Sequence, residues 1–222
     1  TRGPCDAEPA QKQLFCFGLG YAGLALSSVL KSKGWRVCGT CRSQSKAEQL
    51  DGMCGIHAYA FDSECSSLIP DAELALQSAS VVLSTVPPLS SGIEGRGRDP
   101  VADLLQDIPL PNANWLGYLS TTGVYGNWNG EWVDEASMPR GEREGARTRI
   151  AAEAQWMRLH ASLSSPVHIF RVGALYGPHR NVLQTKSDRD NAQRRSMQRY
   201  VSRCHVADLA AAVLKSVDQP NP

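Results

Sequence analysis

Three glycines near the amino terminus have the spacing of a phosphate-binding loop. Gly18, Gly20 and Gly23 form a G-x-G-x-x-G pattern between a short apolar run and a segment with helical character. Gly18 permits a sharp turn, Gly20 lets a pyrophosphate approach the backbone, and Gly23 lets the helix pack closely on the sheet. The helix that follows directs unpaired N–H groups, including those of Tyr21 and Ala22, at the phosphates. The pattern predicts a dinucleotide-binding site, although incidental glycine-rich turns also produce it.

The end of the second expected strand indicates which dinucleotide binds. NAD-binding proteins of the Rossmann type carry an acidic residue there, but this chain has Thr40-Cys41-Arg42-Ser43. A carboxylate would repel a 2′-phosphate, whereas the guanidinium of Arg42 can donate several hydrogen bonds to it. We therefore expect NADP as the cofactor, with NAD as the alternative, and Thr40 and Arg42 beside the adenosine ribose. A solvated Arg42 would remove this preference.

Two further strand ends supply candidate cofactor-binding residues. Asp62 follows the third expected strand, at a place that commonly lies near the adenine. Thr85, Val86 and Pro87 follow the fourth strand, which comes after the crossover to the other half of the sheet. The carboxyl end of that strand borders the crevice where ligands bind in open α/β sheets.

Hydroxyl groups cluster at the end of the fifth expected strand, in Ser120-Thr121-Thr122. At that edge Thr121 can form a hydrogen bond with a substrate oxygen. Tyr125 follows on the same loop and is either a proton donor or a packed residue of the turn. Trp128 and Trp132 then form either an apolar lid or partly buried anchors of the loop.

The elements that position these residues alternate between strands and helices. Strands are expected at residues 14–17, 34–40, 56–61, 79–85 and 114–119, and helices at 24–31, 45–50, 71–77, from 100, and 206–217. This alternation predicts an α/β Rossmann fold, a doubly wound parallel sheet with helices on both faces. We expect one such domain over residues 13–218, a disordered segment over 1–12 and a tail over 219–222. His57, which alternates with apolar neighbours, is expected to be packed.

Composition excludes several other classes of function. The 222 residues carry a formal net charge of +1, which points to neither nucleic acid nor an anionic membrane surface as a partner. No apolar run approaches the ~18 residues of a membrane span. The cysteines number seven, and their scatter through apolar segments indicates a reducing compartment, cytoplasmic or organellar, and no secretion. The single C-x-x-C at Cys38 ends a strand, so we expect no metal site.

Three segments together resemble a known family. They are Ser120–Gly126 followed by Val133-Asp134-Glu135, Ile169–Pro178 with its Tyr-Gly-Pro loop, and Arg203–Ala210 with its His-Val-x-Asp sequence. This combination is similar to the extended short-chain dehydrogenase/reductases, also called the NAD-dependent epimerase/dehydratase family. The resemblance covers most of residues 12–218.

The resemblance assigns roles to several residues. It implies that Thr121 orients the substrate oxygen. When Glu153 is aligned with the glutamate of the family, Gly145 stands at the position of the catalytic tyrosine and Arg149 at that of its lysine. Glycine donates no proton, and arginine stays charged, so Arg149 is left to hold ribose hydroxyls or a phosphate. The chain therefore resembles the atypical, YeeZ-like branch, which lacks the Tyr-x-x-x-Lys pair.

Two classes of function follow. One is an NADP-binding oxidoreductase or epimerase/dehydratase that acts on an unknown small molecule. The other is a catalytically silent dinucleotide-binding sensor or complex subunit, and a homo-oligomer is compatible with both. Residues 181–202 are expected to form a mobile loop on the substrate side. Related proteins continue into a small C-terminal substrate region, and we expect little of that region within these 222 residues.

Overall fold

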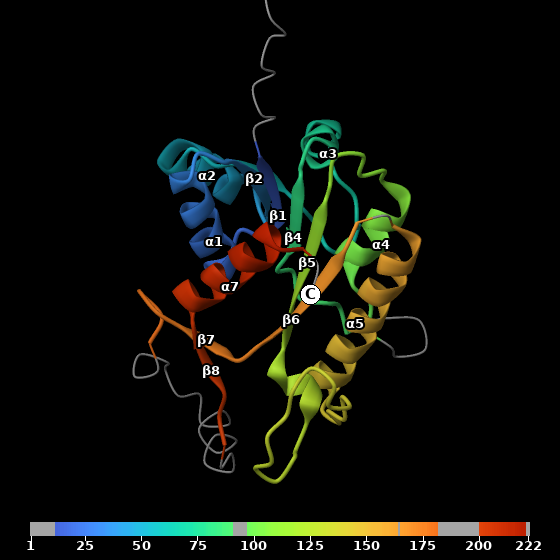
Figure 1. Cartoon of the computed structure of the whole chain (residues 1–222). Coiled ribbons are helices and arrows are strands. Elements are labelled where there is room, and N and C mark those ends of the chain that lie inside the picture. Colours follow the sequence, from blue (N-terminus) through green and yellow to red (C-terminus); the bar gives the residue numbers. More distant parts are fainter. Residues whose placement is uncertain (1–11, 91–96, 164, 182–199, 221–222) are drawn as a thin grey trace, which may run out of the picture.

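Six parallel strands form the central sheet of the computed structural model, which describes residues 12–90, 97–163, 165–181 and 200–220. The strands are β1 (Gln13–Phe17), β2 (Arg36–Cys41), β3 (His57–Ala60), β4 (Val81–Ser84), β5 (Trp115–Thr121) and β6 (Val167–Val172). Their order is β3-β2-β1-β4-β5-β6, so the connection direction reverses between β1 and β4 (Figure 1). This arrangement confirms the doubly wound α/β Rossmann fold.

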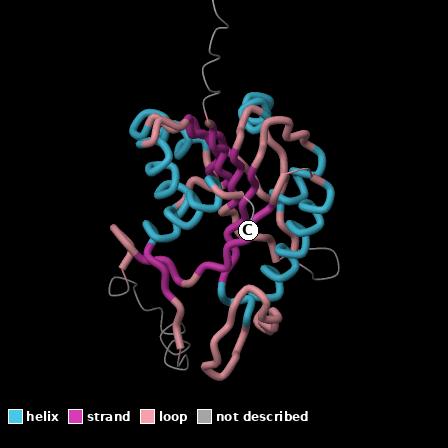
Figure 2. The backbone as a smooth tube through the Cα atoms, viewed as in Figure 1, coloured by secondary structure: helices cyan, strands magenta, loops and turns pink. Residues whose placement is uncertain are grey.

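Helices cover both faces of this sheet. They are α1 (Tyr21–Ser32), α2 (Gln44–Cys54), α3 (Pro70–Gln77), α4 (Pro100–Asp107), α5 (Glu144–Ser162) and α7 (Val206–Asp218). The first two and α7 lie on one face, and α3, α4 and α5 lie on the other (Figure 1). A separate two-stranded parallel sheet pairs β7 (Ala174–Tyr176) with β8 (Arg203–His205). Figure 2 shows that this small sheet lies beyond the carboxyl ends of the main strands.

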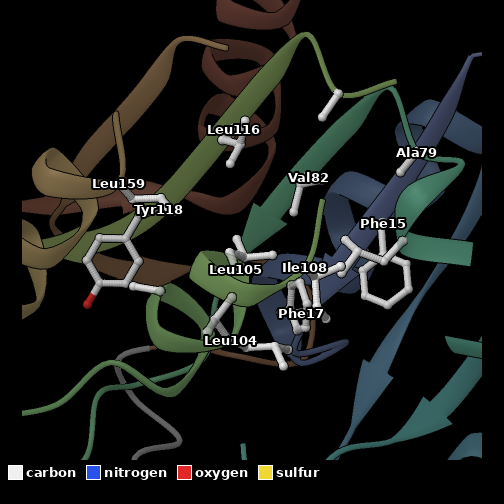
Figure 3. Packing of buried hydrophobic residues seen from close by; sticks show 14 of the residues in the cluster. Phe15, Phe17, Ala79, Val82, Leu104, Leu105, Ile108, Leu116, Tyr118 and Leu159 are labelled. Carbon is white, nitrogen blue, oxygen red and sulfur yellow. The ribbon is translucent and has the colours of Figure 1, made fainter. Parts of the chain in front are cut away.

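The core consists of two apolar layers separated by the sheet. Leu14 and Cys16 of β1 belong to the layer under α1 and α7, whereas Phe15 and Phe17 belong to the layer under α3 and α4. Figure 3 shows this second layer, in which Leu104 and the other labelled side chains pack together. A parallel strand between two helical layers is buried on both sides, so its sequence is apolar throughout rather than alternating.

The expected elements agree with the structure in kind and order, with two differences. The helix that contains Glu153 extends well beyond the aligned positions 145–153, since α5 runs from Glu144 to Ser162. The expectation that His57 is packed was wrong, because β3 is an edge strand and 64% of this side chain is exposed beside Asp51. Most of the expected disordered segment 1–12, most of the loop 181–202 and part of the tail 219–222 lie outside the described residues.

Asp99 fixes the start of α4. Its Oδ1 accepts hydrogen bonds from the N–H groups of Val101 at 3.1 Å and Ala102 at 2.9 Å, and Pro100 occupies the first turn. This agrees with the expected cap. The carboxyl group is fully buried, and burial raises the pKa of Asp99 to about 6, although the two N–H groups oppose the shift.

We expect Asp99→Asn to flatten the dependence of stability on pH. Because the folded protein binds the Asp99 proton more tightly than the unfolded chain does, this residue stabilises the fold most below about pH 4. That contribution is lost as the pH rises through about 6. Asparagine keeps the capping oxygen without a charge, so its stability relative to wild type should increase between those values. Urea denaturation of both proteins measures the difference, and a difference independent of pH would contradict the assignment.

Candidate functional site

The glycine loop, residues 18–23, is held from both sides by threonines of neighbouring strands. Gly18 has a φ of +85°, and its N–H donates to the Thr40 hydroxyl at 3.1 Å. The Thr85 hydroxyl donates to the Gly18 carbonyl at 2.6 Å. Thr40 was expected beside the ribose. Its side chain is only 1% exposed, however, so it holds the loop from the interior of the protein. Thr85 has the same supporting role at the end of β4.

The other two glycines of the loop differ in their surroundings. A Cβ added at Gly20 would meet one atom at 4.0 Å, the carbonyl oxygen of Gly18, and nothing nearer. A Cβ at Gly23 would lie 2.5 Å from that same oxygen and 3.0 Å from the sulfur of Cys16. Gly20 therefore leaves open space above the backbone, and Gly23 permits close packing of helix and loop. These are the surroundings that the sequence pattern predicts for the two positions.

The first turn of α1 is open to an anion. Gly20 is its N-cap and supplies no side-chain cap, and the first turn contains no acidic residue. The N–H of Leu24 donates to the Gly20 carbonyl at 2.8 Å, which begins the helical hydrogen bonding and leaves the N–H groups of Tyr21 and Ala22 before it. A helix N-terminus in this state attracts phosphate, since its partial positive charge is not compensated.

The ends of β2 and β3 place two of the expected residues at the surface. Arg42 is exposed, and within the described part of the chain it has no carboxylate partner. Asp62 is also exposed, and its carboxylate accepts hydrogen bonds from the N–H of Glu64 at 2.9 Å and the thiol of Cys65 at 3.5 Å. Arg42 is thus available to a ligand, whereas Asp62 mainly shapes its own turn.

After β4, Val86 is half-buried against the core and Pro87 is exposed. Because β4 pairs with β1, these residues begin at the same edge of the sheet as the glycine loop. Their placement agrees with the expected border of the ligand crevice. They offer an apolar surface there, since proline has no N–H and valine no polar side-chain atom.

Thr121 ends β5 and caps the short helix η2 (Thr122–Tyr125). Its hydroxyl oxygen accepts a hydrogen bond from the N–H of Gly123 at 3.2 Å. The hydroxyl hydrogen is left to donate to a ligand, and the side chain is partly exposed at the carboxyl edge. The preceding Ser120 is buried instead and donates to Glu153 at 2.5 Å. Neighbouring hydroxyls thus face opposite ways, as the alternation of a strand requires.

A buried ion pair lies behind this strand end. Glu153 of α5 accepts a hydrogen bond from Nη2 of Arg171 in β6 at 2.9 Å, and their side chains are 7% and 19% exposed. The Arg171 guanidinium also lies 4.9 Å from the ring centre of Tyr125, which is 7% exposed. The hydrogen bonds that Arg171 donates to these groups, above all to Glu153, raise the pKa of Arg171. The geometry favours a packed Tyr125 over a proton donor.

The positions aligned with the catalytic tyrosine and lysine lie on the first two turns of α5. A Cβ added at Gly145 would meet no atom of the described residues within 4 Å, so the backbone there lies in open space. Nη1 of Arg149 donates to the Leu119 carbonyl at 2.7 Å and to the Tyr118 hydroxyl at 3.2 Å. Burial above all raises the pKa of Tyr118, so this phenol stays protonated. Arg149 therefore retains donors beside β5 but supplies no acid.

The two tryptophans of the following loop have different surroundings. The indole N–H of Trp128 donates to the Tyr125 carbonyl at 2.9 Å, and Arg140 lies 3.7 Å from its ring. Trp128 is thus an anchor of the loop. Trp132 is 99% exposed. Figure 2 shows the loop itself at the carboxyl end of the sheet, where a ligand would lie.

Three residues near this edge are not identified as site residues by the sequence motifs. Glu153 enters only through the family alignment, and Arg171 and Arg180 receive no role. The signal for Arg171 is its position inside the apolar strand Ile169–Val172, since a charge there needs a buried partner. Among the described residues, no group of three or more His, Cys, Asp or Glu side chains could hold a metal ion. No described helix has the length and apolarity to cross a membrane.

The parallel sheet, the glycine loop and the hydroxyl groups at the end of β5 define a protein with the Rossmann fold that resembles the extended short-chain dehydrogenase/reductases. No protein-family model matches the chain. It is 28% identical to YeeZ of Escherichia coli K12 over 172 residues, which cover 77% of this chain and 61% of YeeZ. The chain thus spans less than two thirds of the length of this curated relative. The similarity to YeeZ confirms the resemblance to the atypical branch of the family.

Solved structures agree in fold. A conserved protein of unknown function from Silicibacter pomeroyi has a TM-score of 0.72 and 29% identity, with 96% of this chain and 69% of that chain covered. The Bordetella bronchiseptica enzyme WbmH in complex with NAD+ has a TM-score of 0.67 and 20% identity, with 94% and 72% covered. Other neighbours are epimerases and a reductase. At such identities these structures show the Rossmann fold that this chain shares.

Proposed function

We propose that the chain binds NADP(H) in the glycine loop and acts on a small molecule as an oxidoreductase or epimerase/dehydratase. One observation above all supports this proposal: the uncapped first turn of α1 faces open space above Gly20. Bare backbone N–H groups beside such space bind a pyrophosphate in the Rossmann fold. The neighbour WbmH holds NAD+ on the same fold, which supports a nicotinamide dinucleotide here.

The preference for NADP rests on Arg42. This exposed guanidinium follows β2, where a carboxylate would otherwise hold the ribose hydroxyls of NAD. Its fork of donors matches a 2′-phosphate, and a charge-assisted hydrogen bond of this kind contributes about 1.5–3 kcal/mol. We therefore expect the chain to bind NADPH about 10- to 100-fold more tightly than NADH.

The substrate would lie between the nicotinamide and the end of β5. When bound, the nicotinamide supplies or accepts a hydride. The hydroxyl of Thr121 donates to the substrate oxygen, and Arg149 on α5 binds ribose hydroxyls or an anionic group of the substrate. Because Gly145 and Arg149 supply no acid, the proton at the reacting oxygen comes from water.

A second candidate is a dinucleotide-binding sensor or complex subunit without catalytic activity. The open space at Gly145 and the packed environment of Tyr125 favour it, because no described residue takes over the role of the missing tyrosine. The partly exposed Thr121 favours the enzyme, since a sensor has no need of a hydrogen-bond donor at that edge.

Turnover separates the two candidates. For an oxidoreductase, NADPH oxidation against a panel of aldehydes, ketones and sugar-nucleotide ketones should show activity. An epimerase or dehydratase returns the hydride to its product, so its activity should appear as conversion of a sugar nucleotide without net NADPH oxidation. In either case Thr121→Val should lower kcat/KM about 100-fold. The NADPH affinity of this variant should equal that of wild type. Thr122→Val is the matched control, since it removes the neighbouring hydroxyl from η2. Tight NADPH binding without turnover of any compound would favour the second candidate, the sensor or complex subunit.

A further inference from the structure

We propose that Arg180 is a further cofactor-binding residue, whose guanidinium binds the pyrophosphate from the side opposite the glycine loop. The proposal rests on the proposed dinucleotide site and deepens it. Arg180 lies in the turn after β7, far from the glycine loop in sequence. Its contact with the first residue of α1 brings it to the phosphate-binding turn.

A short turn sets the position of Arg180. The N–H of Gly177 donates to the Arg180 carbonyl at 2.9 Å, and the N–H of Arg180 donates back to the Gly177 carbonyl at 3.0 Å. Between them His179 has a φ of +60°, in the left-handed region that completes a tight turn. The backbone of Arg180 is therefore fixed by two hydrogen bonds.

Tyr21 joins this turn to the glycine loop. It is the first residue of α1, and its hydroxyl donates to the Pro178 carbonyl at 3.1 Å. A Cβ added at Gly177 would lie 2.7 Å from that hydroxyl, so the turn approaches the tyrosine as closely as a glycine allows. The Arg180 guanidinium lies 5.2 Å from the centre of the Tyr21 ring, within the range of a cation–π interaction.

The charge of Arg180 is available to a ligand. The side chain is exposed, and the residues that the structure describes give its guanidinium no carboxylate partner. A cation beside the positive end of a helix, with no acidic residue in the first turn of α1, creates a field that favours a doubly negative pyrophosphate. The planar guanidinium matches phosphate oxygens in pairs.

The two arginines would therefore bind different parts of the cofactor. Arg42, after β2, would bind the 2′-phosphate that NADPH has and NADH lacks. Arg180, on the ring of Tyr21, would bind the pyrophosphate that both nucleotides share. Replacement of the two residues should thus give different patterns of affinity.

The test is equilibrium titration of the full chain with NADPH and NADH, followed by nucleotide fluorescence. We expect Arg180→Ala to weaken both nucleotides by the same factor, about tenfold or more. Arg42→Ala should weaken NADPH alone. Arg203→Ala, which removes an exposed arginine of the same small sheet on β8, is the matched control and should change neither affinity.

Two variants of Tyr21 test its role as a positioning residue. Tyr21→Phe keeps the ring under Arg180 and should retain most of the affinity, whereas Tyr21→Leu should approach the loss seen in Arg180→Ala. Wild-type affinity in Arg180→Ala, or a loss for one nucleotide only, would overturn the role of Arg180 while leaving the dinucleotide site intact. Absence of binding in wild type would instead overturn the proposed function itself, and this proposal with it.

Discussion

Gly20→Ala is expected to abolish measurable binding of NADPH and NADH while leaving the free energy of unfolding nearly unchanged. The added methyl group meets no protein atom nearer than 4.0 Å, and the φ of −93° at Gly20 suits alanine. The methyl group does occupy the space through which a pyrophosphate reaches the backbone N–H groups. Titration with both nucleotides measures the first effect, and urea denaturation measures the second.

Gly23→Ala is the matched variant, three residues along the same loop, and it should lower the free energy of unfolding, which Gly20→Ala leaves nearly unchanged. Its methyl group would lie 2.5 Å from the carbonyl oxygen of Gly18, so helix and loop must separate. We expect a loss of about 1–3 kcal/mol in the free energy of unfolding, as for other overpacked sites. Equal losses of stability in the two variants, or NADPH affinity near the wild-type value in Gly20→Ala, would contradict the roles assigned to these glycines.

Glu153→Ala is expected to lower the free energy of unfolding more than either glycine substitution does. It removes the partner of Arg171 and the acceptor of the Ser120 hydroxyl, both in the interior behind β5. Breaking a buried ion pair in this way costs about 3–5 kcal/mol, because an uncompensated charge stays buried. Urea denaturation measures the change.

Two controls interpret this result. Glu131→Ala, at an exposed glutamate of the loop, should change the free energy of unfolding by no more than about 0.5 kcal/mol. The double variant Glu153→Met, Arg171→Met should recover much of the loss, since it removes both charges. A loss below about 1 kcal/mol in Glu153→Ala would show that Arg171 is solvated by water or paired with another group once Glu153 is removed.

Local patterns were sufficient to predict the fold and the glycine loop. The apolar run before Gly18, the spacing of the three glycines and the helix that follows are all contained in about 20 residues. The alternation of strands and helices then leaves few topologies, because crossovers between parallel strands are right-handed. The same locality explains the correct cap at Asp99, whose acceptor and donors lie within three residues of each other.

Contacts between distant segments could not be predicted in this way. Glu153 and Arg171 lie on different elements, and only the folded sheet makes their charges meet behind Ser120. Tyr21 and Pro178 are separated by 157 positions, so nothing near the glycine loop indicates the turn that approaches it. The error at His57 has a related cause, since strand alternation does not reveal which strand lies at the edge of the sheet.

The direction of a side chain at a strand end is equally hidden from the sequence. Thr40, Thr85 and Thr121 have the same residue type and the same position after or at the end of a strand. Thr40 and Thr85 form hydrogen bonds with the glycine loop, whereas Thr121 is partly exposed. Which outcome occurs depends on where each strand ends beside its neighbours in the folded sheet.

Equilibrium titration of the wild-type chain with NADPH and with NADH tests the central claim most directly. The account predicts saturable binding of NADPH at one site per chain, about 10- to 100-fold tighter than that of NADH, because Arg42 is proposed to bind the 2′-phosphate. Equal affinities would contradict the role of Arg42, and no affinity for either nucleotide would contradict the dinucleotide site at the start of α1.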